Sequence, residues 1–370
     1  MNERFPTVGI IGAGQLARMS IAPATALGIN LLLFAQDKED SAAQISQHVV
    51  GDFRDLTQLL EFSKQCDLIT FEHELVPLSV IKGLEAAGVK VFPSSNSFQY
   101  SQDKAAMRAK LATYPSPKWK VIEDEGQAFD FPFMAKKISG GYDGRGVWKV
   151  ENLDDLDELL NEHPQLLIEE LIKFDSEIAV MVARSEHGQA TSWAPTQTVQ
   201  SDGICTLTIS PAPTISSTIA EHAQHLALSI ADEISLIGVM AVEMFVKGDQ
   251  LFINELAMRP HNSGHWTIEG ARTSQFEQHL RAILDLPLGD PLMSAKYVVT
   301  GNFYCGDKPN MYRPYLHLMA RTPALKFHQY KSSSVFGELI GHIALAGDDL
   351  SKLIEEIEHA LEYMQGEIDE

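Results

Sequence analysis

Short apolar runs alternate with helical patterns over the first hundred residues. The runs at 7–11, 30–34, 67–71 and 89–92 have the length of strands, and the intervals between them carry amphipathic helical patterns. Strands that alternate with helices in this way form parallel sheets. The pattern therefore predicts a small parallel-sheet α/β domain over residues 1–101.

The pattern changes after residue 101. A helical segment is followed by a proline-rich joint, two strands around a glycine-rich turn, an acidic helix with Asn152 as its N-cap, and another strand. The first helix, the two strands and the last strand are expected at 103–111, 131–137, 147–150 and 165–168. Their order predicts a compact α+β lid over residues 102–174.

Residues 175–370 begin with β-rich stretches and continue with a long helix. We expect strands at 177–184 and 191–200, and a helix at about 218–236 that ends at Gly238 as its C-cap. The hairpin that follows has strands at 239–246 and 251–255 around the turn Lys247-Gly248-Asp249, and an acidic helix starts near residue 348. The expected fold class is α/β with α+β parts, and this third domain is the largest.

Charge and composition narrow the choice of partners. Acidic residues outnumber basic ones by 50 to 29, the formal net charge is −21, and no basic run could follow a nucleic-acid backbone. No apolar stretch reaches membrane-spanning length and the first residues lack a secretory pattern, so we expect a cytoplasmic protein with no nucleic-acid or membrane partner. The cysteines Cys66, Cys205 and Cys305 form no C-x-x-C pair and are interpreted as core residues.

A glycine pattern, Gly12-x-Gly14-x-x-Ala17, links the first strand to the first helix. It places backbone N–H groups and a helix N-terminus where an anion could bind. With Asp37 after the second strand, it has the outline of a dinucleotide-binding pattern. A tight turn that binds nothing would use the same glycines, so both interpretations stay open.

A second glycine-rich segment lies in the predicted lid. Residues 140–146 read Gly-Gly-Tyr-Asp-Gly-Arg-Gly between two strands, and Lys136 comes just before them. Glycines let the backbone approach phosphate oxygens, while Arg145 and Lys136 supply positive charge. We expect a loop that covers phosphates, and a plain hairpin turn is the alternative.

Two glutamates, Glu243 and Glu255, lie in apolar strands of the predicted hairpin. A buried carboxylate without a partner is costly, and a divalent cation between two of them removes that cost. Mg²⁺ that bridges nucleotide phosphates is commonly held by a few carboxylates. The pair therefore predicts a magnesium site, with solvent-facing glutamates as the alternative.

A loop rich in polar side chains directly follows the hairpin, where residues 259–266 read Arg-Pro-His-Asn-Ser-Gly-His-Trp. This density of Arg, His and Asn suits a small oxyanion and an exchangeable proton. His261 and His265 lack the helical spacing of a zinc motif, so zinc is not expected. Neither a G-x-S-x-G elbow nor a Walker A motif occurs, which leaves covalent serine catalysis and P-loop chemistry without support.

These pieces in this order resemble the ATP-grasp superfamily. Within it, the chain resembles the 5-(carboxyamino)imidazole ribonucleotide synthase family over about residues 8–286. The motifs that carry the resemblance are Gly-Ala-Gly-Gln-Leu-Ala-Arg-Met at 12–19, Gly-Gly-Tyr-Asp-Gly-Arg-Gly at 140–146, Asn-Glu-Leu-Ala at 254–257, Arg-Pro-His-Asn-Ser-Gly-His-Trp-Thr at 259–267 and Ser-Gln-Phe-Glu at 274–277.

The resemblance implies an activity and its cofactors. ATP and bicarbonate would form carboxyphosphate, and the exocyclic amine of aminoimidazole ribonucleotide would then be carboxylated, with release of ADP and phosphate in purine biosynthesis. The implied cofactors are ATP and Mg²⁺, with Mn²⁺ as a substitute, and the implied assembly is a cytoplasmic homodimer whose partners are these small-molecule substrates. A lid that excludes water would protect carboxyphosphate from hydrolysis.

The resemblance also implies site residues at the matching positions. The catalytic residues would be Arg145, Arg259, His261 and Asn262. The nucleotide would be held by Arg108, Lys136, Gly141, Tyr142, Asp143, Gly144, Arg145, Gly146, Val147, Glu169, Glu170, Leu171, Ile172, Glu177, Gln200, Asn254 and Glu255. The metal would be held by Glu243 and Glu255. The other substrates would be held by Glu72, Tyr142, Asp143, Arg145, Arg259, His261, Asn262 and Lys331.

The chain departs from the family pattern at two places. Gln200 stands where many relatives carry His, and the C-terminal Gly-Lys and Arg-Lys-x-Gly-His elements appear here as Lys331-Ser332 and Glu338-Leu339-Ile340-Gly341-His342. An acid in place of Arg opposes anion binding, so Lys331 or Arg321 would have to substitute, or the affinity or the substrate has changed. Three alternatives stay open: a relative of the formate-using glycinamide ribonucleotide transformylase, a nicotinamide oxidoreductase, and a non-catalytic nucleotide-binding protein.

Overall fold

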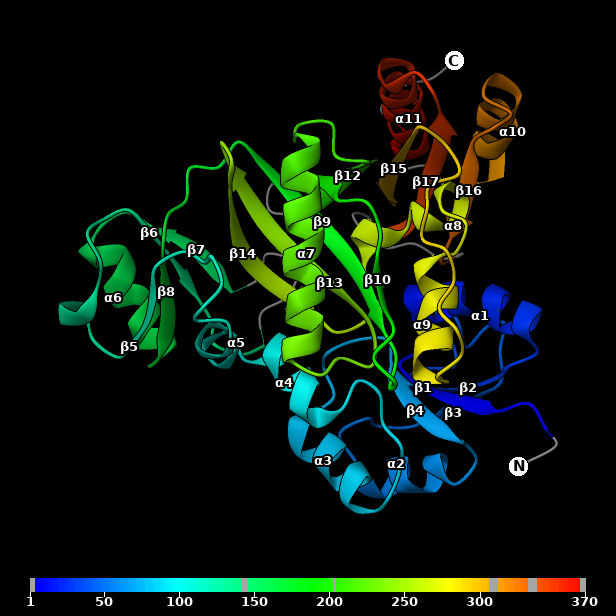
Figure 1. Cartoon of the computed structure of the whole chain (residues 1–370), viewed down its shortest axis with the longest axis horizontal. Coiled ribbons are helices and arrows are strands. Elements are labelled where there is room, and N and C mark those ends of the chain that lie inside the picture. Colours follow the sequence, from blue (N-terminus) through cyan, green and yellow to red (C-terminus); the bar gives the residue numbers. More distant parts are fainter. Residues whose placement is uncertain (1–3, 141–145, 202–203, 306–311, 332–337, 367–370) are drawn as a thin grey trace.

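Three sheets organise the residues that the computed structural model describes, which are 4–140, 146–201, 204–305, 312–331 and 338–366. A parallel sheet lies at the N-terminal end, a small antiparallel sheet forms the lid, and a large antiparallel sheet forms the body (Figure 1). The predicted fold class, α/β with α+β parts, is confirmed. Within these ranges, no helix is long and apolar enough to cross a membrane.

The N-terminal sheet has four parallel strands in the order β3-β2-β1-β4. Its elements are β1 (Thr7–Ile11), α1 (Gln15–Leu27), β2 (Asn30–Ala35), β3 (His48–Val50), α2 (Leu56–Ser63), β4 (Leu68–Phe71), α3 (Leu78–Ala86) and α4 (Ser95–Gln102). The run at 89–92 was expected as a strand, but only Val91 bridges to Ile69. It cannot extend further because Pro93, which follows, has no N–H to donate.

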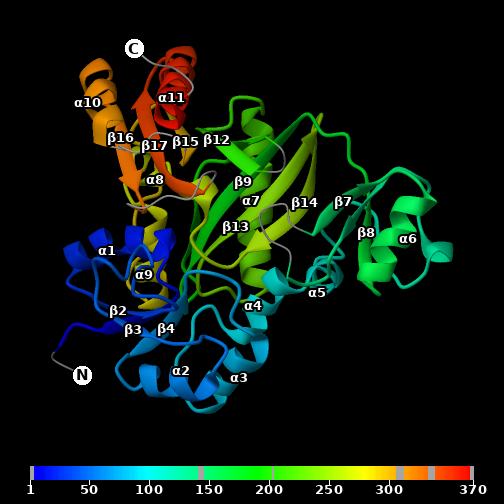
Figure 2. The same cartoon turned by 180° about the vertical axis from the view of Figure 1, so that it is seen from behind.

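The lid sheet has four antiparallel strands in the order β5-β8-β6-β7. Its elements are β5 (Trp119–Ile122), η1 (Glu125–Gln127), β6 (Phe133–Lys136), β7 (Val147–Val150), α6 (Leu153–Glu162) and β8 (Leu166–Glu170). Asn152 caps α6 as predicted, since its side chain accepts from the N–H of Asp155. In Figures 1 and 2 the lid lies to one side of the molecule, beyond the body sheet and the N-terminal sheet.

The body sheet has nine strands, all in antiparallel pairs. Its strands are β9 (Ser176–Arg184), β10 (Ala190–Ser192), β11 (Thr196–Ser201), β12 (Ile204–Ser210), β13 (Gly238–Lys247), β14 (Gln250–Ala257), β15 (Tyr297–Tyr304), β16 (Lys326–Gln329) and β17 (Leu339–Gly347). Its helices are α7 (Ser217–Glu233), η2 (Asn262–Gly264), α8 (Thr267–Gly270), α9 (Gln275–Ile283), α10 (Tyr312–Arg321) and α11 (Leu350–Gln365). Helix α7 covers one face of this sheet next to β9 and β10 (Figure 1).

The prediction that Gly238 caps the long helix was wrong. Helix α7 ends at Glu233 with Ile234 as its C-cap, whereas Gly238 opens β13 with φ +122°. That φ favours glycine, and a Cβ here would lie 3.0 Å from the ring of His279. The glycine therefore lets β13 run close to α9.

A buried arginine on α5 (Lys104–Lys110) joins the lid to the body. Arg108 is 1% exposed; its Nε donates to Glu169 of the lid (2.6 Å), and its Nη1 and Nη2 donate to the carbonyls of Ile253 (2.9 Å) and Asn254 (2.8 Å) in β14. Lys136 also pairs with Glu169 (2.8 Å). Burial alone would raise the pKa of Glu169, but Lys136 and Arg108 hold it below its ordinary value. One ionic cluster therefore fixes the base of the lid.

We expect Arg108→Met to lower the free energy of unfolding by about 3 kcal/mol, because it leaves Glu169 buried with one cation instead of two. Urea unfolding followed by circular dichroism measures the change. Arg272→Met is the matched control, since Arg272 pairs with Asp290 in solvent and such pairs contribute no more than about 1 kcal/mol. Equal midpoints for the two variants would contradict the role given to Arg108.

Candidate active site

The two predicted metal-binding glutamates face each other across the β13–β14 hairpin. Glu243 pairs with Glu255, and the register shifts next to Glu243 so that Asn254 is the extra residue of a β-bulge. Without this bulge, the register set at the turn would bring Asn254 opposite Glu243. The bulge thus aligns the two carboxylates.

The two carboxylates ionise differently. Burial, then the nearby Glu255 and Glu177, raise the pKa of Glu243 to about 8. Burial also acts on Glu255, but Lys104 and Lys136 hold its pKa below its ordinary value. Of the two neighbouring carboxylates, therefore, Glu255 has cations close enough to keep it ionised, whereas the proton of Glu243 is held more tightly.

Lys104 supplies that cation, and the sequence interpretation missed it. Its ammonium forms an ion pair with Glu255, while its side chain is only 10% exposed. A signal was present, because a lysine in the first turn of a helix opposes the helix dipole. Such a position is unfavourable unless an acid outside the helix compensates, as Glu255 does.

The donors at this hairpin fit a magnesium ion that is shared with a nucleotide. They are two carboxylates, and Mg²⁺ in nucleotide sites takes one or two carboxylates and completes its shell with phosphate oxygens and water. In the described part of the chain, no group of three or more His, Cys, Asp or Glu side chains could hold a metal ion. The pair is therefore suited to a metal that arrives with phosphates.

The predicted nucleotide residues of β6, β8, β9 and β11 converge beside the hairpin. Lys136 donates to Oδ1 of Asn254 (3.0 Å) as well as to Glu169. Burial raises the pKa of Glu177 against a hydrogen bond with Gln200 and the charge of Lys136. The structure thus brings Lys136, Glu169, Asn254, Glu177 and Gln200 together.

Other predicted nucleotide residues hold different positions. Glu170 is exposed at the end of β8, Leu171 is half-buried, and Ile172 is buried in the segment that follows. Arg108 lies in the same cluster, but its side chain is enclosed and donates to protein acceptors. Within the described residues, it holds β14 and Glu169 in place.

The glycine-rich loop of the lid is described only at its ends. Gly140 and Gly146 have φ of +78° and +77°, and Val147 pairs with Lys136 at the start of β7. Predicted residues Gly141, Tyr142, Asp143, Gly144 and Arg145 lie outside the described residues. The loop leaves and rejoins the lid sheet next to Lys136.

The loop after β14 is held by two side chains that the sequence interpretation missed. Glu74 accepts from Arg259 Nε (3.1 Å) and from the N–H of Met258 (2.7 Å). The fully buried Gln275 accepts from the N–H of His261 (2.8 Å) and donates to its carbonyl (2.7 Å). Gln275 was visible in the Ser-Gln-Phe-Glu motif, although nothing there revealed its bond partner.

His261 is presented toward the metal pair. Ser263 contacts its Nδ1, and its Nε2 lies 3.4 Å from Oε1 of Glu243. Burial, then Arg259, lower the pKa of His261 to about 3, so the imidazole is neutral at physiological pH. Gly264 must be glycine here, because a Cβ would lie 2.6 Å from Oε1 of Gln275.

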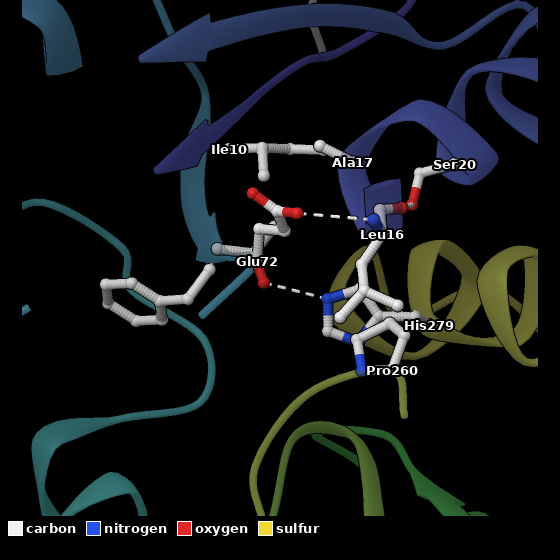
Figure 3. Close-up of a pocket in the computed structure, with 9 residues that line it drawn as sticks. Ile10, Leu16, Ala17, Ser20, Glu72, Pro260 and His279 are labelled. Carbon is white, nitrogen blue, oxygen red and sulfur yellow. Dashed lines mark hydrogen bonds between the residues drawn. The ribbon is translucent and has the colours of Figure 1, made fainter. Parts of the chain in front are cut away.

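The glycine pattern at the start of α1 binds a carboxylate of the protein itself. Glu72, 8% exposed, accepts from the N–H groups of Gly14 (2.6 Å) and Leu16 (3.2 Å). Figure 3 shows its carboxylate directed at Leu16 at the beginning of α1. Burial raises the pKa of Glu72 against these two hydrogen bonds. The helix N-terminus that a dinucleotide phosphate would use is therefore occupied, which removes the basis of the nicotinamide interpretation.

One cavity of about 410 Å³ lies where the three sheets meet. The N-terminal domain, α5, the lid and the loop after β14 all contribute to its walls. They are Gln15, Leu16, Glu72, His73, Glu74, Leu75, Ser101, Gln102, Lys104, Ile138, Ser139, Gly140, Arg259 and Asn262. Predicted residues Glu72, Arg259 and Asn262 therefore line the same space, and Lys104 connects it to Glu255.

Lys331, the remaining predicted substrate residue, follows β16. It forms an ion pair with Glu338, and it is not among the residues that line the cavity. Glu338 is the acid that stands in place of a family arginine. In this structure, the charge of Lys331 is therefore balanced within the protein.

Comparison with known proteins agrees with this architecture. A model described as a ribonucleotide synthetase preATP-grasp domain matches residues 5–102, and one described as an ATP-grasp domain matches residues 104–276. Together these two models cover more than half of the chain.

Full-length relatives narrow the family. The chain is 42% identical to the N5-carboxyaminoimidazole ribonucleotide synthase of Mycobacterium tuberculosis, over 97% of this chain and 88% of the relative. Two crystal structures of the enzyme from Aspergillus clavatus match with TM-scores of 0.89 and 0.88: one is described as complexed with ATP (31% identity) and one as in complex with ADP and 5-aminoimidazole ribonucleotide (30% identity). Each match covers 98% of this chain and 99% of the other. The chain therefore belongs to the N5-carboxyaminoimidazole ribonucleotide synthase family of ATP-grasp ligases.

Proposed function

We propose that this chain uses ATP and bicarbonate to carboxylate the exocyclic amine of 5-aminoimidazole ribonucleotide, with release of ADP and phosphate, in purine biosynthesis. The observation that carries the proposal is the cavity walled by the N-terminal domain, the lid and the loop after β14, which Lys104 connects to Glu255 of the hairpin. Such a cavity lets three substrates meet away from water, which an acyl phosphate intermediate requires.

The nucleotide belongs at the hairpin. Lys136 and the backbone of the glycine loop suit its phosphates, and Glu177 with Gln200 suits its ribose. Mg²⁺ would be held by Glu243 and Glu255, where it would neutralise charge on the phosphates during transfer. Arg108 and Glu169 support this arrangement, because their ion pair and the bonds of Arg108 to two carbonyls join β8 to β14.

Bicarbonate belongs at the loop after β14. Arg259 keeps its orientation through Glu74 and lines the cavity, so its guanidinium can stabilise charge on an acyl phosphate. Asn262 lines the same wall, while the neutral His261 lies between this loop and Glu243. The ribonucleotide would occupy the remaining wall, formed by residues 72–75 and the lid.

The proposal includes a cytoplasmic homodimer. Helix α10 supports an interface between copies, because Leu316 and Met319 on it are 61% and 47% exposed. Analytical ultracentrifugation of the purified chain, which measures its mass in solution, should give the mass of two chains.

Release of ADP should require ATP, Mg²⁺, bicarbonate and 5-aminoimidazole ribonucleotide together, because the cavity is built to protect an intermediate that only the full set consumes. A coupled assay with each component omitted in turn measures this requirement. Formate with glycinamide ribonucleotide serves as the competing pair. Release of ADP at the same rate without the aminoimidazole ribonucleotide and bicarbonate, or turnover of the competing pair, would sink the proposal.

We expect Glu255→Gln to lower kcat at least 100-fold, because the variant loses one of two metal-binding carboxylates at the transferred phosphate. The fold should persist, since the side chain is about a third exposed and Gln keeps its volume. Asp249→Asn is the control, because Asp249 is exposed in the turn of the same hairpin. Near-normal turnover by Glu255→Gln, at saturating Mg²⁺ and with an unchanged circular dichroism spectrum, would remove Glu255 from the metal site.

A further inference from the structure

Three consecutive side chains after β4 reach the cavity wall, and two of them are already engaged. Glu72 accepts from the N–H groups that begin α1, and Glu74 accepts from Met258 and Arg259. Both carboxylates are thereby tied to the protein. His73, between them, lines the same cavity of about 410 Å³.

The ring of His73 has a fixed orientation. Leu75 donates its N–H to Nδ1 (3.3 Å), and the ring lies against Phe53 with 4.8 Å between centroids. Its Cδ2 lies 3.0 Å from where a Cβ on Gly12 would stand, so that glycine, with φ +108°, makes room for it. An N–H directed at Nδ1 favours the neutral tautomer that carries its proton on Nε2.

That Nε2–H is available to a ligand. The side chain is half-buried, and Nε2 has no hydrogen-bond partner among the residues that the structure describes. Burial, then Arg259, lower the pKa of His73 to about 4, so the ring stays neutral and keeps its single donor at physiological pH. A fixed neutral donor between two carboxylates selects an oxygen acceptor.

The cations described around this cavity, and Lys331 beyond it, are already paired with carboxylates. Lys331 is paired with Glu338 and does not line the cavity, while Lys104 is paired with Glu255. Arg259 is shared with Glu74. His73 therefore adds a neutral donor to a cavity whose described cations, Lys104 and Arg259, are already paired with carboxylates.

We propose that Nε2–H of His73 donates a hydrogen bond to an oxygen of the ribose 5-phosphate part of the ribonucleotide and so helps to select that substrate. This inference rests on the proposed function, because it names a contact of the same reaction. It makes His73 a binding residue on the wall opposite the nucleotide hairpin.

The test compares His73→Phe, which keeps a ring but removes the donor, with His73→Gln, whose Nε2–H can reach a similar position. His73→Phe should raise KM for 5-aminoimidazole ribonucleotide about tenfold, because the variant loses one neutral hydrogen bond to that substrate. The KM for ATP should stay within about twofold of the wild-type value. His73→Gln should recover most of that affinity. His48→Phe is the matched control, because His48 is a half-buried histidine of the same domain that does not line the cavity.

A structural role for His73 would give a different result. Equal increases in both KM values, an unchanged KM for the ribonucleotide in His73→Phe, or no recovery in His73→Gln would overturn the inference. If His73→Phe does not fold, ¹⁵N spectra of histidine-labelled wild-type protein decide: the Nε2 signal of His73, assigned through His73→Gln, should shift on addition of the ribonucleotide and stay in place with ATP. Wild-type turnover that ignores the ribonucleotide would instead sink the proposed function, so the two failures are distinguishable.

Discussion

The β-bulge at Asn254 is the constraint on which the site depends. By adding one residue to β14, it sets Glu255 opposite Glu243 instead of Asn254. The displaced Asn254 then accepts from Lys136 through its side chain and from Arg108 through its carbonyl. One local irregularity therefore links the pair Glu243 and Glu255 to the lid. In a regular hairpin of the same sequence, Asn254 would lie opposite Glu243, and every later residue of β14 would pair with a different residue of β13. Glu243 and Glu255 would then no longer lie opposite each other.

Charge is distributed so that an acidic molecule can bind anions. The formal net charge of −21 repels phosphates at a distance, yet Lys104, Lys136, Arg108 and Arg259 are all gathered around one hairpin and its loop. Each of them is paired with a carboxylate, which lowers the cost of burying it. Mg²⁺ held by Glu243 and Glu255 would compensate these two carboxylates, so Lys104 would then be able to pair with a phosphate without leaving Glu255 as a bare charge.

Much of this could be predicted from the sequence, and the particular successes have physical reasons. The strand-helix alternation gave the parallel sheet, and the turn Lys247-Gly248-Asp249 gave the hairpin with both glutamates. Local patterns could not give the partners of Lys104, Glu74 or Gln275, since these partners lie far away in the chain. Gly238 was misjudged for the same reason, because its backbone conformation accommodates His279 of a distant helix. The roles of individual residues in binding stay predictions.

The glycine pattern near the N-terminus shows how one motif can serve two purposes. Its sequence favoured an anion at the start of α1, and an anion is there, but it is the carboxylate of Glu72. An internal carboxylate ties the end of β4 to α1, and residues 72–75, which follow β4, line the cavity. The helix N-terminus thus holds the segment from which His73 and Glu74 line the cavity.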